Sequence, residues 1–365
     1  MIKNKRLLAL LMVIIMVTAL LSGCAQADKS GTEGSEASAA REITDMAGRT
    51  VTVPAAEDIE SVFSVSTASA IMLYMAAPQK LLGWNYELND MEKAIILEEY
   101  HDLPSFGMGD AINYEAVIMA APDIAVTCGK INDAIISECE TMTEKLGIPV
   151  VAVDSDLNKS AEAFRFMGEL LGEEEHCENL ALYVEELFED IDKLAGIPEE
   201  DKVRVYFGNG EDSLETAPNG SSHAQILDTI NVINVADLEI GDGSRVQVSA
   251  EQLIAWDPDV IVVNGEPKAG KSGGVAAEDI LNNPNYATLE AVKEGKVYGT
   301  PSAPFGWIDR PAGPNRLIGM RWFPAIVYSD YLHCDVEEEV HKFFELFYHI
   351  DMTDEQMDAL LKGTL

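Results

Sequence analysis

Two short stretches of this 365-residue chain combine aromatic and polar side chains in a pattern that suits ligand binding. Trp84 and Tyr86 stand two residues apart, and Trp307 precedes Arg310 in a segment rich in Pro and Gly. An aromatic face can stack on a planar ligand, and a guanidinium can pair with carboxylate or catecholate oxygens. We therefore expect ligand contacts here, with two alternatives: each Trp as a core or rim residue, and Arg310 as a helix cap or ion-pair partner.

Other candidates for ligand contact follow predicted strands, because ligands of open α/β sheets bind beyond the carboxyl ends of the strands. They are Ser66, Met108, Lys130, His223 and Arg245. His223 lies just before a predicted helix and could touch a metal or a ligand, or could instead be a polar loop or capping residue.

No set of residues predicts catalysis or a resident cofactor. The chain has no Gly-x-Ser-x-Gly, no complete P-loop and no His-Glu-x-x-His motif. Its six histidines show no paired ligand spacing, so a metal chelate is favoured over a bare ion. We therefore expect a binding protein and not an enzyme.

The first 24 residues have the pattern of an export signal. Three basic residues precede an uncharged apolar run of 15 residues, 7–21, which is shorter than the roughly 20 residues of a spanning helix. The following Leu21-Ser22-Gly23-Cys24 resembles the lipobox of bacterial lipoproteins. That resemblance implies cleavage before Cys24, a diacylglycerol thioether and an acylated N-terminus, with acyl groups such as palmitate. We expect a protein anchored by lipid outside the cytoplasm.

Charge excludes one class of partner. The chain carries a net charge of −38, and loss of residues 1–23 removes three positive charges, which makes it −41. Nucleic-acid binding needs basic patches and is therefore not expected. The acidity serves solubility or, alternatively, docking on a basic partner.

Composition also divides the chain. Residues 24–41 are mostly small and polar and predict a flexible tether. The remaining length suits two domains, which we expect at residues 42–156 and 197–365, with a helical connection over 157–196. The four cysteines after Cys24 are widely spaced, so their pattern predicts no metal or redox motif and leaves disulfides and buried thiols both open.

An internal similarity supports two related lobes. Residues 114–129 and 250–265 share Glu, Pro, Asp, Val and Gly at a constant offset of 136 residues. Each copy predicts a short helix, then Pro-Asp, then a strand buried on both faces. The pattern therefore predicts a duplicated α/β unit with a mostly parallel sheet in each lobe. The alternative is a chance similarity of two helix–strand units.

Further elements fit around these two units. The predicted strands span residues 59–65, 80–84, 149–153, 203–207 and 296–299, and a hairpin joins 43–45 to 50–53. The predicted helices span 68–77, 132–146, 224–230, 336–350 and 354–361. Apolar periodicity over 157–196, interrupted near Gly172, predicts one or two helices, the longer crossing between the lobes.

Several motifs together resemble the substrate-binding proteins of ABC importers for iron–siderophores, haem and cobalamin. The resemblance rests on residues 41–54 (REITDMAGRTVTVP), on Pro-Asp at 122–123 and 258–259, on 147–150, on 309–319 (DRPAGPNRLIG) and on Arg321-Trp322. It implies two Rossmann-like lobes joined by one long helix and a monomer that carries a metal chelate or corrinoid to a permease and its ATPase.

Two acidic residues match positions through which this family docks. Glu115 and Glu251 occupy the same place in the duplicated unit, each in the first turn of a helix. The resemblance implies contact with the permease through one acid per lobe. The alternative is electrostatic, because acids stabilise helix N-termini by ~0.3–1 kcal/mol.

Other functions remain open at this stage. An oxyanion binder for molybdate or tungstate would rely on loop N–H groups and on Ser66 or Thr67. An extracellular two-lobed enzyme would need a catalytic set that the sequence does not show, and an adhesion module has no need of a duplicated cleft. Fold alone does not decide the ligand.

Overall fold

The computed structural model describes residues 39–239, 245–266 and 271–363, so Cys24, the export signal and most of the predicted tether lie outside the described residues. In these described parts of the chain, no helix is long and apolar enough to cross a membrane.

The first lobe is built on a parallel sheet of three strands in the order β3-β4-β5. These strands are β3 (Val62–Ser64), β4 (Ile124–Gly129) and β5 (Val150–Asp154). The helices of the lobe are α2 (Thr67–Ala76), α3 (Asp90–Lys93), α4 (Tyr114–Ala120) and α5 (Asp133–Leu146). A separate antiparallel hairpin, β1 (Arg41–Thr44) and β2 (Thr50–Val53), confirms the predicted one.

One predicted strand of this lobe is absent. Residues 80–84 form no strand, and only Leu81 and Trp84 make isolated bridges, to Val62 and Ser105. The chain turns away from the sheet because Gly83 lies against the 104–106 segment, where a Cβ would meet the Pro104 carbonyl oxygen at 2.2 Å.

The second lobe contains a six-stranded mixed sheet. Its parallel part joins β6 (Arg204–Asn209) to β8 (Ile233–Asn234) and to β10 (Val260–Val263), which pairs with β11 (Val297–Gly299). Its antiparallel part adds β7 (Glu215–Thr216) and β9 (Val246–Gln247). The helices are α8 (Gln225–Thr229), α9 (Ala250–Trp256), α10 (Gly273–Asn282) and α11 (Glu290–Lys293).

The duplicated unit has the same structure in both lobes. Helices α4 and α9 each end at a residue with left-handed backbone, Ala121 and Asp257, and Pro-Asp then leads into β4 or β10. The Asp of each pair, Asp123 or Asp259, accepts hydrogen bonds from backbone N–H groups where the neighbouring strand approaches. The Asp side chain thus ties the start of its own strand to the neighbouring strand of the sheet.

Residues 160–191 form two antiparallel helices, which confirms the predicted break near Gly172, and the longer helix connects the lobes. α6 (Ser160–Leu171) ends at Gly172, whose φ of 74° favours glycine, and α7 (Glu174–Ile191) follows. The start of α7 lies against the first lobe, where Cys177 contacts the Ala76 carbonyl, and its end contacts Arg321 of α12 (Gly319–Val327) in the second lobe.

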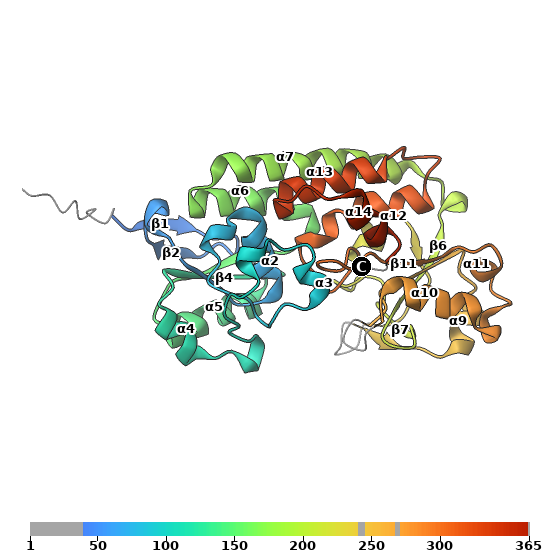
Figure 1. Ribbon diagram of the computed structural model, residues 1–365, viewed down its shortest axis with the longest axis horizontal. Helices are drawn as coiled ribbons and strands as arrows, with labels where there is room; N and C mark the ends of the chain where they lie inside the picture. The colour runs from blue at the N-terminus through green and yellow to red at the C-terminus, as the bar shows by residue number, and fades with distance from the viewer. Residues whose placement is uncertain (1–38, 240–244, 267–270, 364–365) are drawn as a thin grey trace, which may run out of the picture. The chain divides into compact units, whose positions relative to one another are not determined.

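The C-terminal helices pack against this connection. α13 (Val336–Tyr348) lies beside α7 and also contacts α2 and α12, and α14 (Asp354–Leu361) follows it (Figure 1). The chain therefore returns over the first lobe after completing the second. Short 3-10 helices complete the element order: η1 (Ala56–Asp58), η2 (Pro78–Lys80), η3 (Glu98–Tyr100), η4 (Gly109–Ala111), η5 (Leu157–Lys159), η6 (Asp192–Gly196), η7 (Glu199–Asp201), η9 (Pro284–Tyr286) and η10 (Pro314–Leu317).

The apolar core runs through both lobes and the helices that connect them. The parallel strands of both sheets are buried on both faces, and the largest apolar cluster continues through α2, α6, α7, α12 and α13. Cys128, Cys139, Cys177 and Cys334 are all unpaired, and the first three are buried, so the structure favours buried thiols over disulfides.

Candidate ligand-binding cleft

A small cavity of about 90 Å³ is lined by side chains from both lobes. The first lobe contributes the segment that contains Tyr86 and Glu92, and the second contributes residues at and beyond the carboxyl ends of its strands. The lining residues are Tyr86, Asn89, Met91, Glu92, Asn264, Ser302, Pro304, Phe305, Gly306, Asp309 and Arg310. This is the position at which α/β sheets bind ligands.

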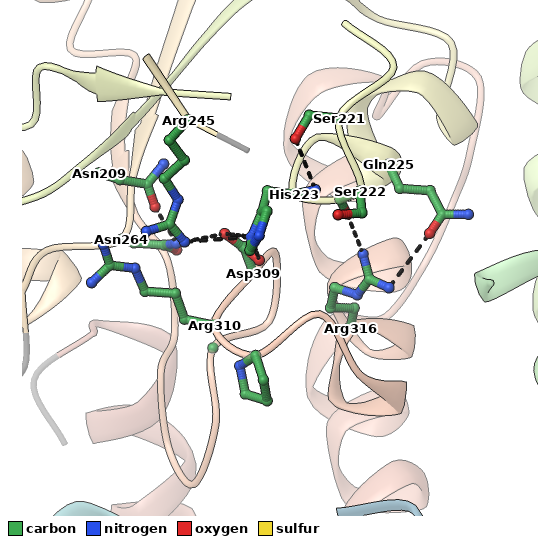
Figure 2. A network of polar contacts seen from close by, with 12 residues as sticks. Asn209, Ser221, Ser222, His223, Gln225, Arg245, Asn264, Asp309, Arg310 and Arg316 are labelled. Atoms are coloured by element: carbon green, nitrogen blue, oxygen red, sulfur yellow. Dashed lines mark hydrogen bonds and ion pairs between the residues drawn. The ribbon is translucent and has the colours of Figure 1, made fainter. Parts of the chain in front are cut away.

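Asp309 is the centre of a polar network beside this cavity. Its carboxylate is fully buried and accepts hydrogen bonds from His223 Nδ1 at 2.7 and 2.8 Å and from Arg245 Nη2 at 2.5 Å. Figure 2 shows the two donors reaching Asp309 from separate segments. Three residues that are 22 to 86 positions apart therefore converge only in the folded chain.

Electrostatics determine the protonation of this network. Burial by itself would raise the pKa of Asp309, but the hydrogen bonds and charges of His223 and Arg245 outweigh it and lower the pKa. An ionised carboxylate can only accept, so His223 donates through Nδ1. In the neutral ring, Nε2 then keeps its free lone pair, which is the form of imidazole that binds metals.

The loop that carries Asp309 is tight. Gly306 donates its N–H to the Arg310 carbonyl, and a Cβ at Gly306 would meet the Asp309 carbonyl oxygen at 2.0 Å. Arg310 has a left-handed backbone with φ of 66°, a conformation that is uncommon outside glycine. Its Nη1 lies 2.7 Å from Glu266, and its Nη2 lies 3.8 Å from Glu215.

Arg316 also holds the loop, because its Nε donates a hydrogen bond to the Gly313 carbonyl. Arg316 is 1% exposed and donates to the Ser222 carbonyl and to Gln225 (Figure 2). Burial lowers its pKa to about 10, although Asp309 and Asp156 act in the opposite direction. Gln225 also donates a hydrogen bond to Asp156 of the first lobe at 2.8 Å, which links the two lobes.

Two asparagines end neighbouring strands of the second lobe. Asn209 is the last residue of β6, Asn264 follows β10, and Asn264 Nδ2 donates to Asn209 Oδ1 at 2.8 Å. The other polar atoms of both amides, Asn209 Nδ2 and Asn264 Oδ1, are buried without a partner among the described residues. Asn264 lines the cavity, so its amide is one of the polar groups at the wall of the site.

The candidates of the first lobe are in different situations. Ser66 is the N-cap of α2, where its side chain accepts from Ser69, so it has a structural partner. Tyr86 lines the cavity and donates its hydroxyl to Glu92 at 2.7 Å. Met108 is 46% exposed with its sulfur near Thr67, and Lys130 is exposed after β4, neither of them lining the cavity.

The structure corrects the interpretation of the two tryptophans. Trp84 is 3% exposed, packs against Tyr74 and donates its indole N–H to the Tyr100 carbonyl. Trp307 is 1% exposed and packs against Trp322 and Phe344. Neither indole lines the cavity, and both belong to the apolar core, which favours the alternative of core residues.

Sequence reasoning missed several residues of the site. The sequence places Asp309 and Arg316 only within the 309–319 motif, and its patterns do not single out Glu92. The signal for Asp309 was its place next to Arg310 in a Pro- and Gly-rich loop. Glu92 carried no comparable signal, because it reads as the third residue of a helical capping box.

The two acidic candidates for docking lie at equivalent places. Glu115 and Glu251 are exposed in the first turns of α4 and α9, whose N-caps are Asn113 and Ser249. Hydrogen bonds from its own backbone N–H and from Ser249 lower the pKa of Glu251. Within the described residues, no group of three or more His, Cys, Asp or Glu is placed to hold a metal ion.

Comparison with known proteins decides the family. The sequence profile of a family described as periplasmic binding protein matches residues 64–304, about two thirds of the chain. This chain belongs to the periplasmic binding protein family. Its members act outside the cytoplasm, and the two-lobed α/β architecture expected from the sequence is confirmed. No curated protein matches the chain by sequence.

Several solved structures have the same fold, and this chain aligns with nearly the whole length of each. An ABC transporter solute-binding protein from Sulfurospirillum deleyianum is 25% identical with a TM-score of 0.78, covering 88% of this chain and 99% of that one. The molybdate periplasmic binding protein MolA of Haemophilus influenzae is 21% identical with a TM-score of 0.65, covering 86% and 99%. The triscatecholate siderophore-binding protein FeuA of Bacillus subtilis is 16% identical with a TM-score of 0.54, covering 79% and 96%.

Proposed function

We propose that this periplasmic binding protein is the solute-binding lipoprotein of an ABC importer, and that it captures an iron complex or a corrinoid between its lobes. The observation that carries the proposal is the cavity that Tyr86 and Glu92 share with Asn264, Asp309 and Arg310. A site built from both lobes holds its ligand against two separately folded surfaces. Related proteins of known structure, which are named for binding a siderophore or haem or for a complex with nickel and histidine, support the ligand class.

An oxyanion such as molybdate is the second candidate. The cavity has a small volume of about 90 Å³, which favours a small ligand. The related structure with molybdate supports the same choice. The charges around the cavity weigh against it, because the two arginines nearest the site already face carboxylates.

Delivery of the ligand requires contact with a permease, and we assign this to Glu115 and Glu251. On α4, Ile118 and Met119 follow Glu115 by three and four residues and are 51% and 86% exposed, so they share its face of the helix. The face therefore offers a carboxylate with exposed apolar groups beside it. A permease surface with basic residues beside an apolar patch would complement it.

Anchoring would keep the protein near that permease. Cys24 would carry the lipid, and the tether to residue 41 would give the two lobes a reach on the order of 20 Å. Replacing Cys24 with Ala is expected to release the protein from membranes.

Thermal unfolding of the mature chain tests the ligand class. The panel consists of ferric siderophores, haem, cobalamin and molybdate, with bare metal ions as controls. A ligand at 100 times its Kd adds about 2.7 kcal/mol to the free energy of unfolding, enough for a clear rise in Tm. Stabilisation by a ferric complex, haem or cobalamin supports the proposal, stabilisation by molybdate alone supports the second candidate, and no shift with any of them overturns both.

A further inference from the structure

Glu92 is the one charged residue lining the cavity that lacks an oppositely charged partner among the described residues. Three charged side chains line it: Glu92, Asp309 and Arg310. Asp309 is paired with His223 and Arg245, and Arg310 with Glu266 and Glu215. Glu92 forms no ion pair within the described ranges of the chain, although it is only 4% exposed.

The known contacts of Glu92 explain only part of its position. One carboxylate oxygen accepts from the Asn89 N–H at 2.8 Å, and Asn89 in turn accepts from the Glu92 N–H, which makes a capping box for α3. The other oxygen accepts from the Tyr86 hydroxyl at 2.7 Å. A capping box works equally well with glutamine or on an exposed surface, so it gives no reason to bury an ionised group beside a cavity.

An unpaired buried carboxylate is costly, and a ligand can remove that cost. Neutral donors compensate a buried charge only in part, whereas a cation or strong hydrogen-bond donor compensates it well. Burial raises the pKa of Glu92, and the two hydrogen bonds offset only part of this effect. An anionic group in the same cavity would instead be repelled by Glu92 and would find both arginines already engaged.

The volume of the cavity limits what can approach Glu92. The cavity is small, about 90 Å³, so Glu92 would meet one terminal group of a bound complex there. The long-range field acts in the same direction, because a chain with a net charge of −38 repels anions and attracts cations.

We propose that Glu92 determines ligand specificity, and that the ligand is a neutral or positively charged metal complex that places an ammonium or similar donor group against this carboxylate. This inference rests on the proposed function, since it assumes that the cavity belongs to the site of a captured complex. On this proposal, Glu92 selects among metal complexes by their charge and disfavours oxyanions and triscatecholate chelates.

Two ligands that differ by one charge test it. Ferrioxamine B is a ferric trihydroxamate whose free chain end is an ammonium group, and its N-acetyl derivative replaces that ammonium with a neutral amide. Affinities of the mature protein for both are measured by fluorescence quenching. We expect the ammonium form to bind at least about tenfold more tightly, a difference of about 1.4 kcal/mol.

Glu92→Gln is the decisive variant, because glutamine keeps the capping acceptor and removes only the charge. The ratio of the two affinities is expected to fall to about one in Glu92→Gln. Glu87→Gln is the matched control, an exposed acid that does not line the cavity, and should keep the ratio of the unmodified protein. Because each ratio is taken within one variant, a change in folding stability does not affect it.

The outcomes separate this inference from the proposed function. Equal binding of the two ligands, or a preference that survives in Glu92→Gln, overturns the role of Glu92 while leaving metal-complex capture intact. Tighter binding of ferric enterobactin or molybdate than of ferrioxamine B also overturns it. Absence of binding by every complex in the thermal panel overturns the proposed function and this inference together.

Discussion

At the scale of single residues, the site depends on how charges are paired in the fold. Asp309 is buried between His223 and Arg245, and Arg310 lies between two glutamates. The sequence predicts His223, Arg245 and Arg310 as ligand contacts because of their residue types. The structure gives each of them a protein partner, so their first role is to hold one another in place.

Replacing Asp309 tests that role. In Asp309→Asn the amide cannot neutralise Arg245, and breaking such a buried pair costs about 3–5 kcal/mol. We expect a loss of this size in the free energy of unfolding, measured by urea denaturation at pH 7. Asp110→Asn, an exposed acid of the first lobe, should change it by less than about 0.5 kcal/mol. An unchanged midpoint for Asp309→Asn would contradict the structural role.

The pH dependence of stability tests the charge of Glu92. Its folded pKa is raised above the ordinary value of 4.5, so the folded state binds the proton more tightly than the unfolded state. Stability is therefore lost as pH rises from the ordinary value through the raised one. Glu92→Gln should unfold at a higher temperature than the unmodified protein at pH 7.5, and this advantage should vanish below pH 4.5.

The control for this experiment is again Glu87→Gln, which should behave alike at both pH values. A Glu92→Gln variant that is less stable than the unmodified protein at pH 7.5 would mean that the carboxylate contributes to stability and is not held at a cost. That result would also remove the energetic argument for a ligand partner.

At the scale of elements, a buried arginine holds the connecting helices to the second lobe. Arg321 of α12 is 2% exposed and pairs with Asp190 of α7. Its Nε lies 3.1 Å from Glu339 of α13, a charge contact without hydrogen-bond alignment. Tyr183 of α7 donates to the same Glu339 carboxylate at 3.1 Å. Three helices thus meet at one side chain.

Replacing Arg321 with Met should loosen this junction. The loss lies between the ~1 kcal/mol of an exposed pair and the ~3–5 kcal/mol of a fully buried one, because the two acids are 26% and 18% exposed. Arg165→Met is a matched control, since Arg165 also bridges two glutamates but is 37% exposed, and should cost no more than about 1 kcal/mol. Equal losses in urea denaturation would contradict the argument.

Sequence patterns predicted most elements but not the 80–84 segment. Apolar periodicity and caps located α2, α5, α7 and α13 within a few residues, because these signals are local. The 80–84 segment has the composition of a strand, yet the close approach of Gly83 to residues 104–106 turns it away. That contact is long-range and leaves no local pattern.

At the scale of the whole molecule, function requires a partner on the membrane. The double variant Glu115→Lys with Glu251→Lys reverses one charge on each lobe. We expect uptake of the stabilising complex to fall by about tenfold or more while ligand affinity stays unchanged, because both residues lie outside the cavity. Cell uptake and binding to the purified protein are measured in parallel.

A matched pair of exposed acids, one per lobe, controls for total charge. Glu144→Lys with Glu278→Lys changes the net charge equally and leaves α4 and α9 untouched. Uptake should persist in this variant. Normal uptake by the Glu115/Glu251 variant would assign both residues to helix stabilisation alone.

The sequence by itself determined the two-lobed α/β fold, the duplicated unit and the break between the connecting helices. Hydrophobic periodicity, Pro-Asp pairs and glycine positions act over a few residues and can be read along the chain. Only the tertiary structure decided that Trp84 and Trp307 belong to the core, and that Asp309 and Glu92 line the cavity. Burial and charge pairing depend on side chains that come together from distant segments. The exposure of an aromatic side chain and the partners of a carboxylate are therefore decided only when both lobes are in place.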